Sequence, residues 1–259
     1  MQYKAIFFDM DGTLTSLKTH KVPESAVEAM RLLKKRGVKI FLATGRHHLL
    51  LLNPVVNAIP FDAHLTANGQ YCYNDREVIR CRPFPRSDKE ALVKLLETRP
   101  HAIMFQTRTE IFQNLTNAQI QAGTEFLGIP QFPVKDAAHC LDQDVFEMLL
   151  FADEEAEREI LQVMPGSCSV RWTPTFADLF EASGGKHNGI DALLDYYNIP
   201  LEETMAFGDS TNDLGMLQHV KLGIAMGNAM EEVKKAADYV TDTPEKDGIY
   251  NALKKFGVI

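Results

Sequence analysis

Four short apolar runs in this 259-residue chain each end at a small or acidic residue. They are AIFF at 5–8, VKIFLA at 38–43, TMAF at 204–207 and LGIAM at 222–226. A strand that is buried on both faces has a continuous apolar sequence, whereas a strand with one face in water alternates. The runs therefore predict strands of a parallel sheet that is covered by helices on both faces.

Helical patterns fall between these runs. Residues 23–36 begin with Pro and Glu, end in basic residues and precede a glycine, as helices commonly do. Residues 190–197, 213–219 and 230–237 also have helical patterns. This alternation predicts an α/β chain with a Rossmann-like, doubly wound parallel sheet. Ligands of such sheets bind beyond the carboxyl ends of the strands.

The alternation stops near residue 83, which indicates a second kind of domain. Pro83-Phe84-Pro85 and Ser183-Gly184-Gly185 are typical of connections between domains. We therefore expect an inserted α+β domain at 83–184, within a core formed by 1–82 and 185–259. A length of 259 residues also favours two domains. Candidate helices of the insert are 88–97 and 118–127, and candidate strands are 102–106, 147–151 and 169–172.

The composition excludes several classes of partner. Apolar residues make up 45% of the chain, charged residues 24%, and the net charge is −8. This charge argues against nucleic acid or an anionic membrane as a main partner. No apolar run approaches the length of a membrane helix, no signal peptide is recognisable, and the four cysteines form no metal-binding pattern. We expect a cytoplasmic protein that is a monomer or a weak dimer.

The strand at 5–8 leads directly into Asp9 and Asp11, which are followed by Gly12. Neighbouring carboxylates repel each other, and burial raises their pKa unless a cation is present. Mg2+ accepts one or two carboxylates together with waters and phosphate oxygens, so the pair favours a magnesium site. A calcium-binding loop or a solvated turn is the alternative, although an EF-hand loop needs its glycine at position six and Gly12 is at position four.

Two basic residues and a hydroxyl are candidates for binding an anion. Thr44, in LATGRHH, should lie at the end of a buried strand, beside the free backbone N–H groups of a turn at Gly45. The same residues could form only a turn. Arg46 could bind a substrate anion through two N–H groups or be a surface charge. Lys186, in SGGKHNGI, could hold an anion at the start of a helix or be solvated.

A second acidic pair lies in GDSTNDLGML. Asp209 and Asp213 are four residues apart, with Asn212 between them. If a helix begins near Ser210, both acids lie near its N-terminus, where the helix dipole favours them. Asp209 could instead cap that helix, and Asp213 could orient a lysine or a metal-bound water.

Together these segments resemble the haloacid dehalogenase superfamily of phosphohydrolases. FDMDGTL resembles its first motif, Thr44 its second, Lys186 its third and GDSTND its fourth. The position and size of the insert imply a C2-type cap, and GDSTNDLGM is similar to the Cof-type sugar-phosphate phosphatases. These core motifs are specific and span both halves of the chain.

The resemblance implies a role for each acid. Asp9 would be the nucleophile that forms an aspartyl-phosphate, and Asp11 would protonate the leaving group and then activate water. Mg2+ would be held by Asp9, the backbone carbonyl of Asp11 and Asp209. Asp213 would support the metal site.

The remaining candidates would contact the phosphoryl group. Thr44 and Lys186 would stabilise its charge during transfer, together with the turn at Gly45. Arg46 would bind a substrate anion, and Asn212 would touch a phosphate oxygen.

The sequence therefore predicts a Mg2+-dependent phosphatase of small phosphorylated metabolites, with sugar phosphates preferred. A phosphotransferase or mutase on the same core is one alternative, and release of free phosphate would distinguish it. A non-catalytic sensor of phosphorylated ligands is another, but it would not need both a nucleophile and an acid.

Trp172, Phe176 and Asp178 are candidates for contact with the leaving group. Trp172 and Phe176 could instead belong to the core of the insert. Asn68-Gly69 is expected to form a hairpin turn.

Overall fold

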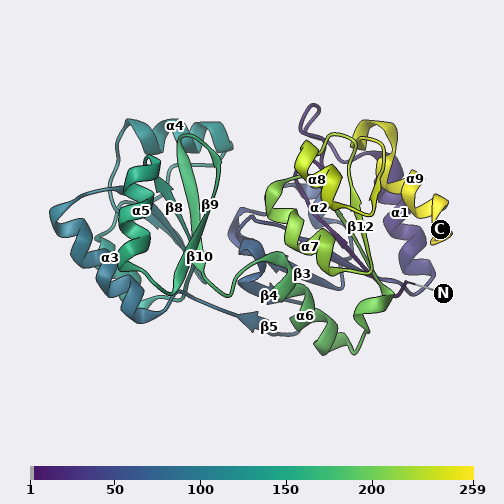
Figure 1. Ribbon diagram of the computed structural model, residues 1–259, viewed down its shortest axis with the longest axis horizontal. Coiled ribbons are helices and arrows are strands. Elements are labelled where there is room, and N and C mark those ends of the chain that lie inside the picture. Colours follow the sequence, from purple (N-terminus) through teal and green to yellow (C-terminus); the bar gives the residue numbers. More distant parts are fainter. Residues whose placement is uncertain (1–2) are drawn as a thin grey trace. The chain divides into compact units, whose positions relative to one another are not determined.

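The computed structural model describes residues 3–259 and, of Trp172, only the backbone. The Trp172 side chain, a candidate for contact with the leaving group, thus lies outside the described part. The chain divides into two compact units (Figure 1). The core unit contains the chain up to Arg46, Leu51–Cys81 and Gly185–Ile259. The insert unit contains His47–Leu50 and Arg82–Gly184.

The core unit is built on one sheet with the strand order β13-β12-β11-β1-β2-β3-β4-β5. All pairs from β13 to β3 are parallel, and β4 and β5 extend the sheet in antiparallel fashion. The strands are β1 (Ala5–Phe8), β2 (Lys39–Ala43), β3 (Ala63–Thr66), β4 (Tyr71–Tyr73), β5 (Val78–Cys81), β11 (Thr204–Gly208), β12 (Leu222–Ala225) and β13 (Tyr239–Val240).

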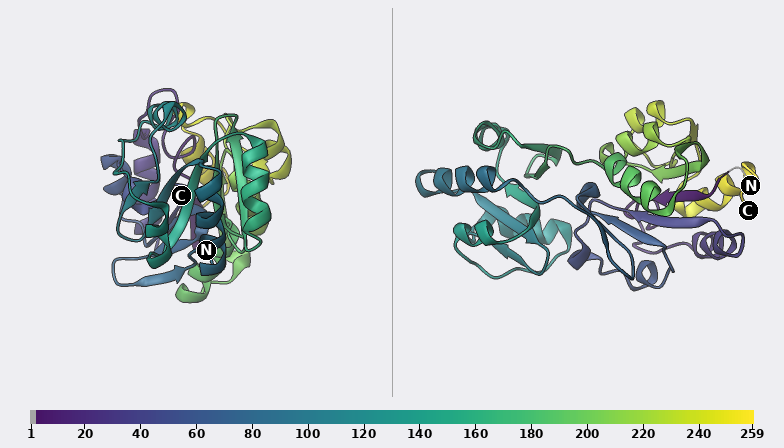
Figure 2. Two further views of the ribbon diagram at one scale, coloured as in Figure 1. Left: turned by 90° about the vertical axis from the view of Figure 1, so that its left-hand side faces the viewer. Right: turned by 90° about the horizontal axis from the view of Figure 1, so that it is seen from below.

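Helices cover both faces of this sheet, which confirms the doubly wound α/β fold. The apolar run of β1 is fully buried because its residues alternate between two cores. Ile6 and Phe8 pack with α1 and α9, whereas Ala5 and Phe7 pack with α6 and α7. Figure 2 shows helices on opposite sides of the core sheet. The helices are α1 (Glu24–Lys35), α2 (Pro54–Asn57), α6 (Lys186–Tyr197), α7 (Leu214–His219), α8 (Glu231–Ala236) and α9 (Gly248–Lys255).

The insert unit has an antiparallel sheet with the order β7-β6-β8-β10-β9. One face packs against α3 and α5, and the other carries a smaller core that includes Ile120 of α4. Phe176 is fully buried in that smaller core, as expected if it stabilises the insert. The elements are α3 (Arg86–Thr98), β6 (Ala102–Thr107), β7 (Ile111–Gln113), α4 (Ala118–Leu127), β8 (Val145–Phe151), α5 (Glu154–Val163), β9 (Ser167–Thr173) and β10 (Phe176–Glu181).

Two predicted helices differ from those observed. The helix predicted at 190–197 begins earlier, at Lys186, and the one predicted at 213–219 is a 3₁₀ turn (Thr211–Asp213) followed by α7. Ser210 is the N-cap of the 3₁₀ turn, in a reciprocal pair of hydrogen bonds with Asp213. Within residues 3–259, no helix is long and apolar enough to cross a membrane.

Candidate active site

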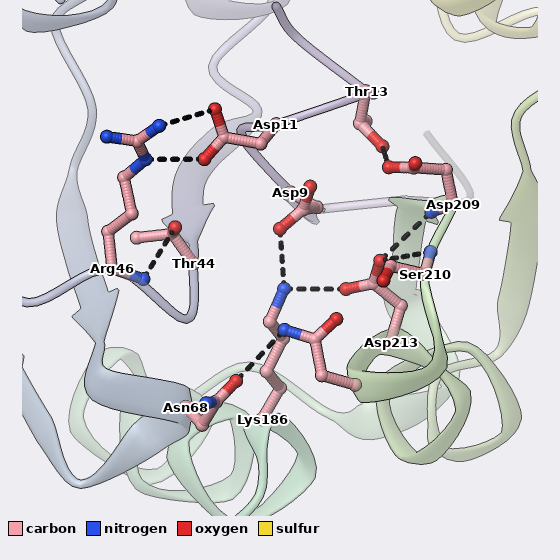
Figure 3. Close-up of polar contacts among 11 residues, drawn as sticks. Asp9, Asp11, Thr13, Thr44, Arg46, Asn68, Lys186, Asp209, Ser210 and Asp213 are labelled. Atoms are coloured by element: carbon pink, nitrogen blue, oxygen red, sulfur yellow. Dashed lines mark hydrogen bonds and ion pairs between the residues drawn. The ribbon is translucent and has the colours of Figure 1, made fainter. Parts of the chain in front are cut away.

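The candidate residues gather where three neighbouring strands end. β11, β1 and β2 are adjacent and parallel, so their carboxyl ends reach the same edge of the sheet. Asp9 directly follows β1, Thr44 follows β2 and Asp209 follows β11. Three side chains that are far apart in sequence are therefore brought together in the core unit (Figure 3).

Lys186 lies at the centre of the site. It is the first residue of α6, and its side chain is buried. Its Nζ donates to Asp9 Oδ1 and to Asp213 Oδ1, each at 2.6 Å (Figure 3). Burial alone would lower the pKa of Lys186, but the charges of Asp213 and Asp9 raise it above its ordinary value. The amine is therefore a fixed positive charge at neutral pH, and its burial excludes the alternative of a solvated lysine.

In the described part of the chain, the Asp9 carboxylate is hydrogen-bonded through one of its two oxygens. Its carboxylate is 5% exposed, and burial and the nearby charge of Asp213 raise its pKa well above the ordinary range. Oδ1 accepts the hydrogen bond from Lys186. Among the described residues no group donates to the other oxygen, Oδ2. One oxygen of Asp9 is thus free to act on a ligand.

Asp213 turns its two oxygens in different directions. Oδ1 accepts from Lys186, and Oδ2 accepts from the backbone N–H groups of Asp209 (2.9 Å) and Ser210 (3.0 Å). Ser210, rather than Asp209, is therefore the cap of the following turn. Asp213 joins the lysine to the loop that carries Asp209, so this carboxylate orients its neighbours.

Two residues that the sequence analysis missed hold Asp209. Thr13 Oγ1 donates to Asp209 Oδ1 at 2.9 Å, and Asn228 Nδ2 contacts Oδ2 at 3.5 Å. Asn228 Nδ2 also donates to the Gly12 carbonyl at 2.9 Å and so links the loop after β1 to that after β12. Asn228 follows the apolar run 222–226, and its place after a strand was the signal that could have found it.

Gly12 allows these loops to approach closely. Its φ of +89° lies in the left-handed region, and a Cβ there would come within 2.2 Å of Asp209 Oδ2. Any larger residue at this position would therefore displace Asp209.

The three buried acids form a candidate cation site. Ligand atoms of Asp9, Asp209 and Asp213 lie within 4.8 Å of one another. Burial, and then the charge of Asp213, raise the pKa of Asp209 to about 7. Among the described residues, Lys186 is the one cationic group that forms an ion pair with these carboxylates, so the cluster fits a hard divalent cation, which prefers oxygen ligands.

Arg46 contacts Asp11 in this structure. Its Nε donates to Asp11 Oδ2 at 2.6 Å and its Nη2 donates to Oδ1 at 3.1 Å, so the guanidinium binds both carboxylate oxygens (Figure 3). Both side chains are about one third exposed. Arg46 is thus neither an isolated surface charge nor free to bind an anion while this pair persists.

The loop after β2 presents unused donors. Thr44 Oγ1 accepts from the backbone N–H of Arg46 at 3.0 Å, which leaves its own proton available. The N–H of Gly45 has no acceptor among the described residues. Asn212 is nearby, because a Cβ on Gly45 would lie 3.2 Å from its Nδ2.

Asn68 is the third residue that the sequence analysis left without a role. It lies in the expected turn between the antiparallel strands β3 and β4, has a left-handed backbone and is buried. Its Oδ1 accepts from Asn212 Nδ2 at 3.0 Å. Asn68 therefore fixes the amide of Asn212 beside Gly45.

Comparisons with known proteins identify the family of this chain. A family model described as haloacid dehalogenase-like hydrolase matches residues 6–253. The chain is 31% identical to "Putative phosphatase YkrA" of Bacillus subtilis over 100% of both chains. It is 26% identical to "Pyridoxal phosphate phosphatase YbhA" of Escherichia coli, with 96% of this chain and 97% of that protein covered. The solved structure of the "HAD Subclass IIB Sugar Phosphatase BT4131" has a TM-score of 0.89 and 38% identity, covering 99% of this chain and 100% of its own.

The raised pKa of Asp209 predicts a pH-dependent stability of the metal-free protein. The folded state binds more protons than the unfolded state between pH 4 and 7, so the free energy of unfolding falls as pH rises through this window. We expect the wild type to lose on the order of 2 kcal/mol more than Asp209→Asn between pH 5 and 8. Urea denaturation in EDTA measures this, and equal losses in the two proteins would contradict the prediction.

Proposed function

We propose a mechanism for this chain. It belongs to the haloacid dehalogenase-like hydrolase family and is a phosphatase of small phosphorylated metabolites. It uses Mg2+, forms an aspartyl-phosphate on Asp9 and prefers sugar phosphates. The observation that carries the proposal is the buried amine of Lys186, which fixes Asp9 by one oxygen and leaves the other free.

Asp9 is the nucleophile in this mechanism. Its free oxygen attacks phosphorus in line with the ester bond, and the bond from phosphorus to the leaving oxygen breaks. The strand β1 positions the carboxylate rigidly, because its four residues are fully buried. Burial and the charge of Asp213 raise the pKa of Asp9, and the adjacent charge of Lys186 opposes them by favouring the ionised form.

Asp11 transfers the protons. In the first step it gives its proton to the leaving alcohol, and in the second it takes a proton from the water that attacks the aspartyl-phosphate. That attack breaks the bond from phosphorus to Asp9 and releases inorganic phosphate.

A carboxylate that is paired with a guanidinium can accept a proton but has none to donate, so Arg46 must first release Asp11. The phosphate of an arriving substrate competes for the same guanidinium, which gives Arg46 its role in substrate binding.

Mg2+ fits the oxygen ligands of the site. Asp9, the backbone carbonyl of Asp11 and Asp209 would hold it, and Asp213 would support it indirectly, since both of its oxygens already accept hydrogen bonds. When bound, the ion would offset the negative charge of the carboxylates and the phosphoryl oxygens. The Asp11 carbonyl accepts no backbone hydrogen bond in the described part of the chain, so it is available as a ligand.

The phosphoryl oxygens are bound by neutral donors and one cation. The neutral donors are the Thr44 hydroxyl, the N–H of Gly45 and the Asn212 amide, and the cation is the amine of Lys186. Such donors stabilise charge most where they are fixed before substrate arrives. Asn68 contributes by holding Asn212.

The preference for sugar phosphates is supported by similarity. The Cof-type motif GDSTNDLGM and the likeness to a sugar phosphatase both favour it. The likeness to a pyridoxal phosphate phosphatase makes that ester the second candidate. Both substrates are small phosphate monoesters, so the chemistry above applies to either.

Phosphate release from a substrate panel tests the proposal. We expect Mg2+-dependent release from sugar phosphates and p-nitrophenyl phosphate, and a loss of about three orders of magnitude or more in Asp9→Ala, because the nucleophile is gone. Pyridoxal phosphate and nucleotides complete the panel. Release that persists in EDTA, or in the variant, would refute the mechanism. Transfer of phosphate to a sugar without free phosphate would favour the phosphotransferase alternative.

Asp11→Asn separates proton transfer from metal binding. We expect this variant to bind Mg2+ as tightly as the wild type, because its backbone carbonyl remains, yet to lose at least a hundredfold in kcat. Asp209→Asn is the matched control and should lose Mg2+ affinity. Titration calorimetry with Mg2+ measures both, and an equal loss of affinity would contradict the role of Asp11.

Asn228→Ala tests the positioning of Asp209. Removing the amide frees the Gly12 carbonyl and Asp209 Oδ2 from their shared partner. We expect a tenfold to hundredfold loss of Mg2+ affinity without loss of fold, as is typical of groups that orient metal ligands. Titration calorimetry and thermal denaturation provide the two readouts. Unchanged Mg2+ affinity would show that Thr13 alone holds Asp209.

A further inference from the structure

The insert unit carries two buried polar side chains that the proposed reaction does not use. Gln106 and Glu147 are directly opposite each other on the neighbouring antiparallel strands β6 and β8. Only 1% of Gln106 and 3% of Glu147 are exposed. Buried polar groups in native proteins are nearly always hydrogen-bonded, so a buried group without a partner requires an explanation.

Both side chains have acceptor atoms without a donor in the described part of the chain. Gln106 Oε1 is buried and has no hydrogen-bond partner there. Among the same residues, no group donates to the Glu147 carboxylate and no cation forms an ion pair with it. An amide oxygen and an ionised carboxylate can only accept hydrogen bonds. A ligand that satisfies these atoms must therefore be a donor.

A second carboxylate lies near Glu147. Asp178, on β10, is opposite Leu149, which is two residues from Glu147 on the same face of β8. Burial, and then the charge of Asp178, raise the pKa of Glu147 well above its ordinary range. A positively charged ligand would offset both effects, because it would pair with the carboxylate that burial and like charge disfavour. The cluster of Gln106, Glu147 and Asp178 therefore favours a cation.

The surroundings of the cluster favour an organic cation over a metal ion. Among the described residues, no third acid, histidine or cysteine joins Glu147 and Asp178 within metal-binding distance. Because side chains alternate along a strand, the cluster shares its face of the sheet with Met104 and Leu149 of the smaller apolar core. An ammonium group has three donors for the three acceptors, and a carbon skeleton attached to it can pack against apolar side chains.

We propose that this cluster binds the ammonium group of a small organic amine. Gln106 Oε1 and the two carboxylates accept its three hydrogen bonds, and Met104 and Leu149 contact its carbon skeleton. Asp178 is half-buried, so the ligand enters from the side of β10. A carboxylate has about four lone-pair sites, so Asp178 can accept from the ligand in addition to its present contacts. The inference rests on the insert unit alone and does not depend on the phosphatase mechanism.

An NMR titration of the ¹⁵N-labelled full chain with cyclohexylamine, in EDTA, tests this site. The amine is protonated at neutral pH, and cyclohexanol is its neutral counterpart of similar shape. We expect saturable shifts of the backbone amides of Gln106 and Glu147, with a Kd on the order of millimolar for so small a ligand. Cyclohexanol should bind at least tenfold more weakly. Because the signals belong to single residues, binding of the amine to the acids of the candidate active site is distinguished.

Glu147→Gln removes the charge with little change of shape. We expect at least tenfold weaker binding of cyclohexylamine to this variant, and severalfold weaker binding to Gln106→Leu, which lacks one acceptor. Glu155→Gln is the matched control, because Glu155 is exposed on α5, which packs on the opposite face of the sheet. Its affinity should equal that of the wild type. The thermal midpoint of Glu147→Gln should not fall, because a buried acid without a partner becomes a neutral amide.

Three results would overturn the proposal. The first is the absence of saturable shifts at these amides in the wild type, at amine concentrations up to tenfold above the expected Kd. The second is equal affinity for cyclohexanol, which would show that the positive charge is not recognised. The third is equal affinity of Glu147→Gln and the wild type for the amine, which would place the amine elsewhere.

Discussion

The buried amine of Lys186 is the interaction on which the site depends. Three carboxylates at the end of a parallel sheet repel one another, and burial raises the cost of their charge. One ammonium between Asp9 and Asp213 offsets part of that cost and fixes both side chains by short hydrogen bonds. What remains is an excess of negative charge at Asp9 and Asp209, which is what a divalent cation requires. The cluster therefore fits the divalent cation that the proposed mechanism requires.

The parallel sheet makes this crowding possible. Adjacent strands β11, β1 and β2 run in the same direction, so residues that directly follow them are neighbours although up to two hundred positions separate them in the chain. The strands can be buried on both faces because α1 and α9 cover one side and α6 and α7 the other. A rigid strand followed by a short loop gives each acid a fixed backbone from which its side chain reaches the site.

The two ends of the core sheet carry opposite chemistry. At the carboxyl ends, acids outnumber the cation that holds them. At the amino ends, Lys34 and Lys39 both donate to the carboxylate of Asp62. The same helix, α6, contributes Lys186 to the first and the tyrosines Tyr196 and Tyr197 to the second. A single element therefore connects the candidate active site with the network around Asp62.

Much of the site could be predicted because its residues lie next to strong local patterns. Asp9, Thr44 and Asp209 each follow an apolar run, and the resemblance of the motifs to a known family identified Lys186 and Asp213 as well. Asn68, Thr13 and Asn228 were missed, because the role of an amide or hydroxyl in a loop cannot be inferred until its hydrogen-bond partner is known. Arg46 was predicted as a candidate, but its contact with Asp11 was not, because that partner is 35 positions away.

The sequence by itself therefore determined the parallel α/β core and the candidate residues that follow its central strands, since apolar periodicity and strand ends are local properties. Tertiary structure alone decided that Ser210 rather than Asp209 caps the turn, that Arg46 grips Asp11, and that Asp213 turns one oxygen to the lysine and one to the backbone. A hydrogen bond depends on distances of a few tenths of an ångström between residues far apart in the chain, and only the packed fold sets those distances.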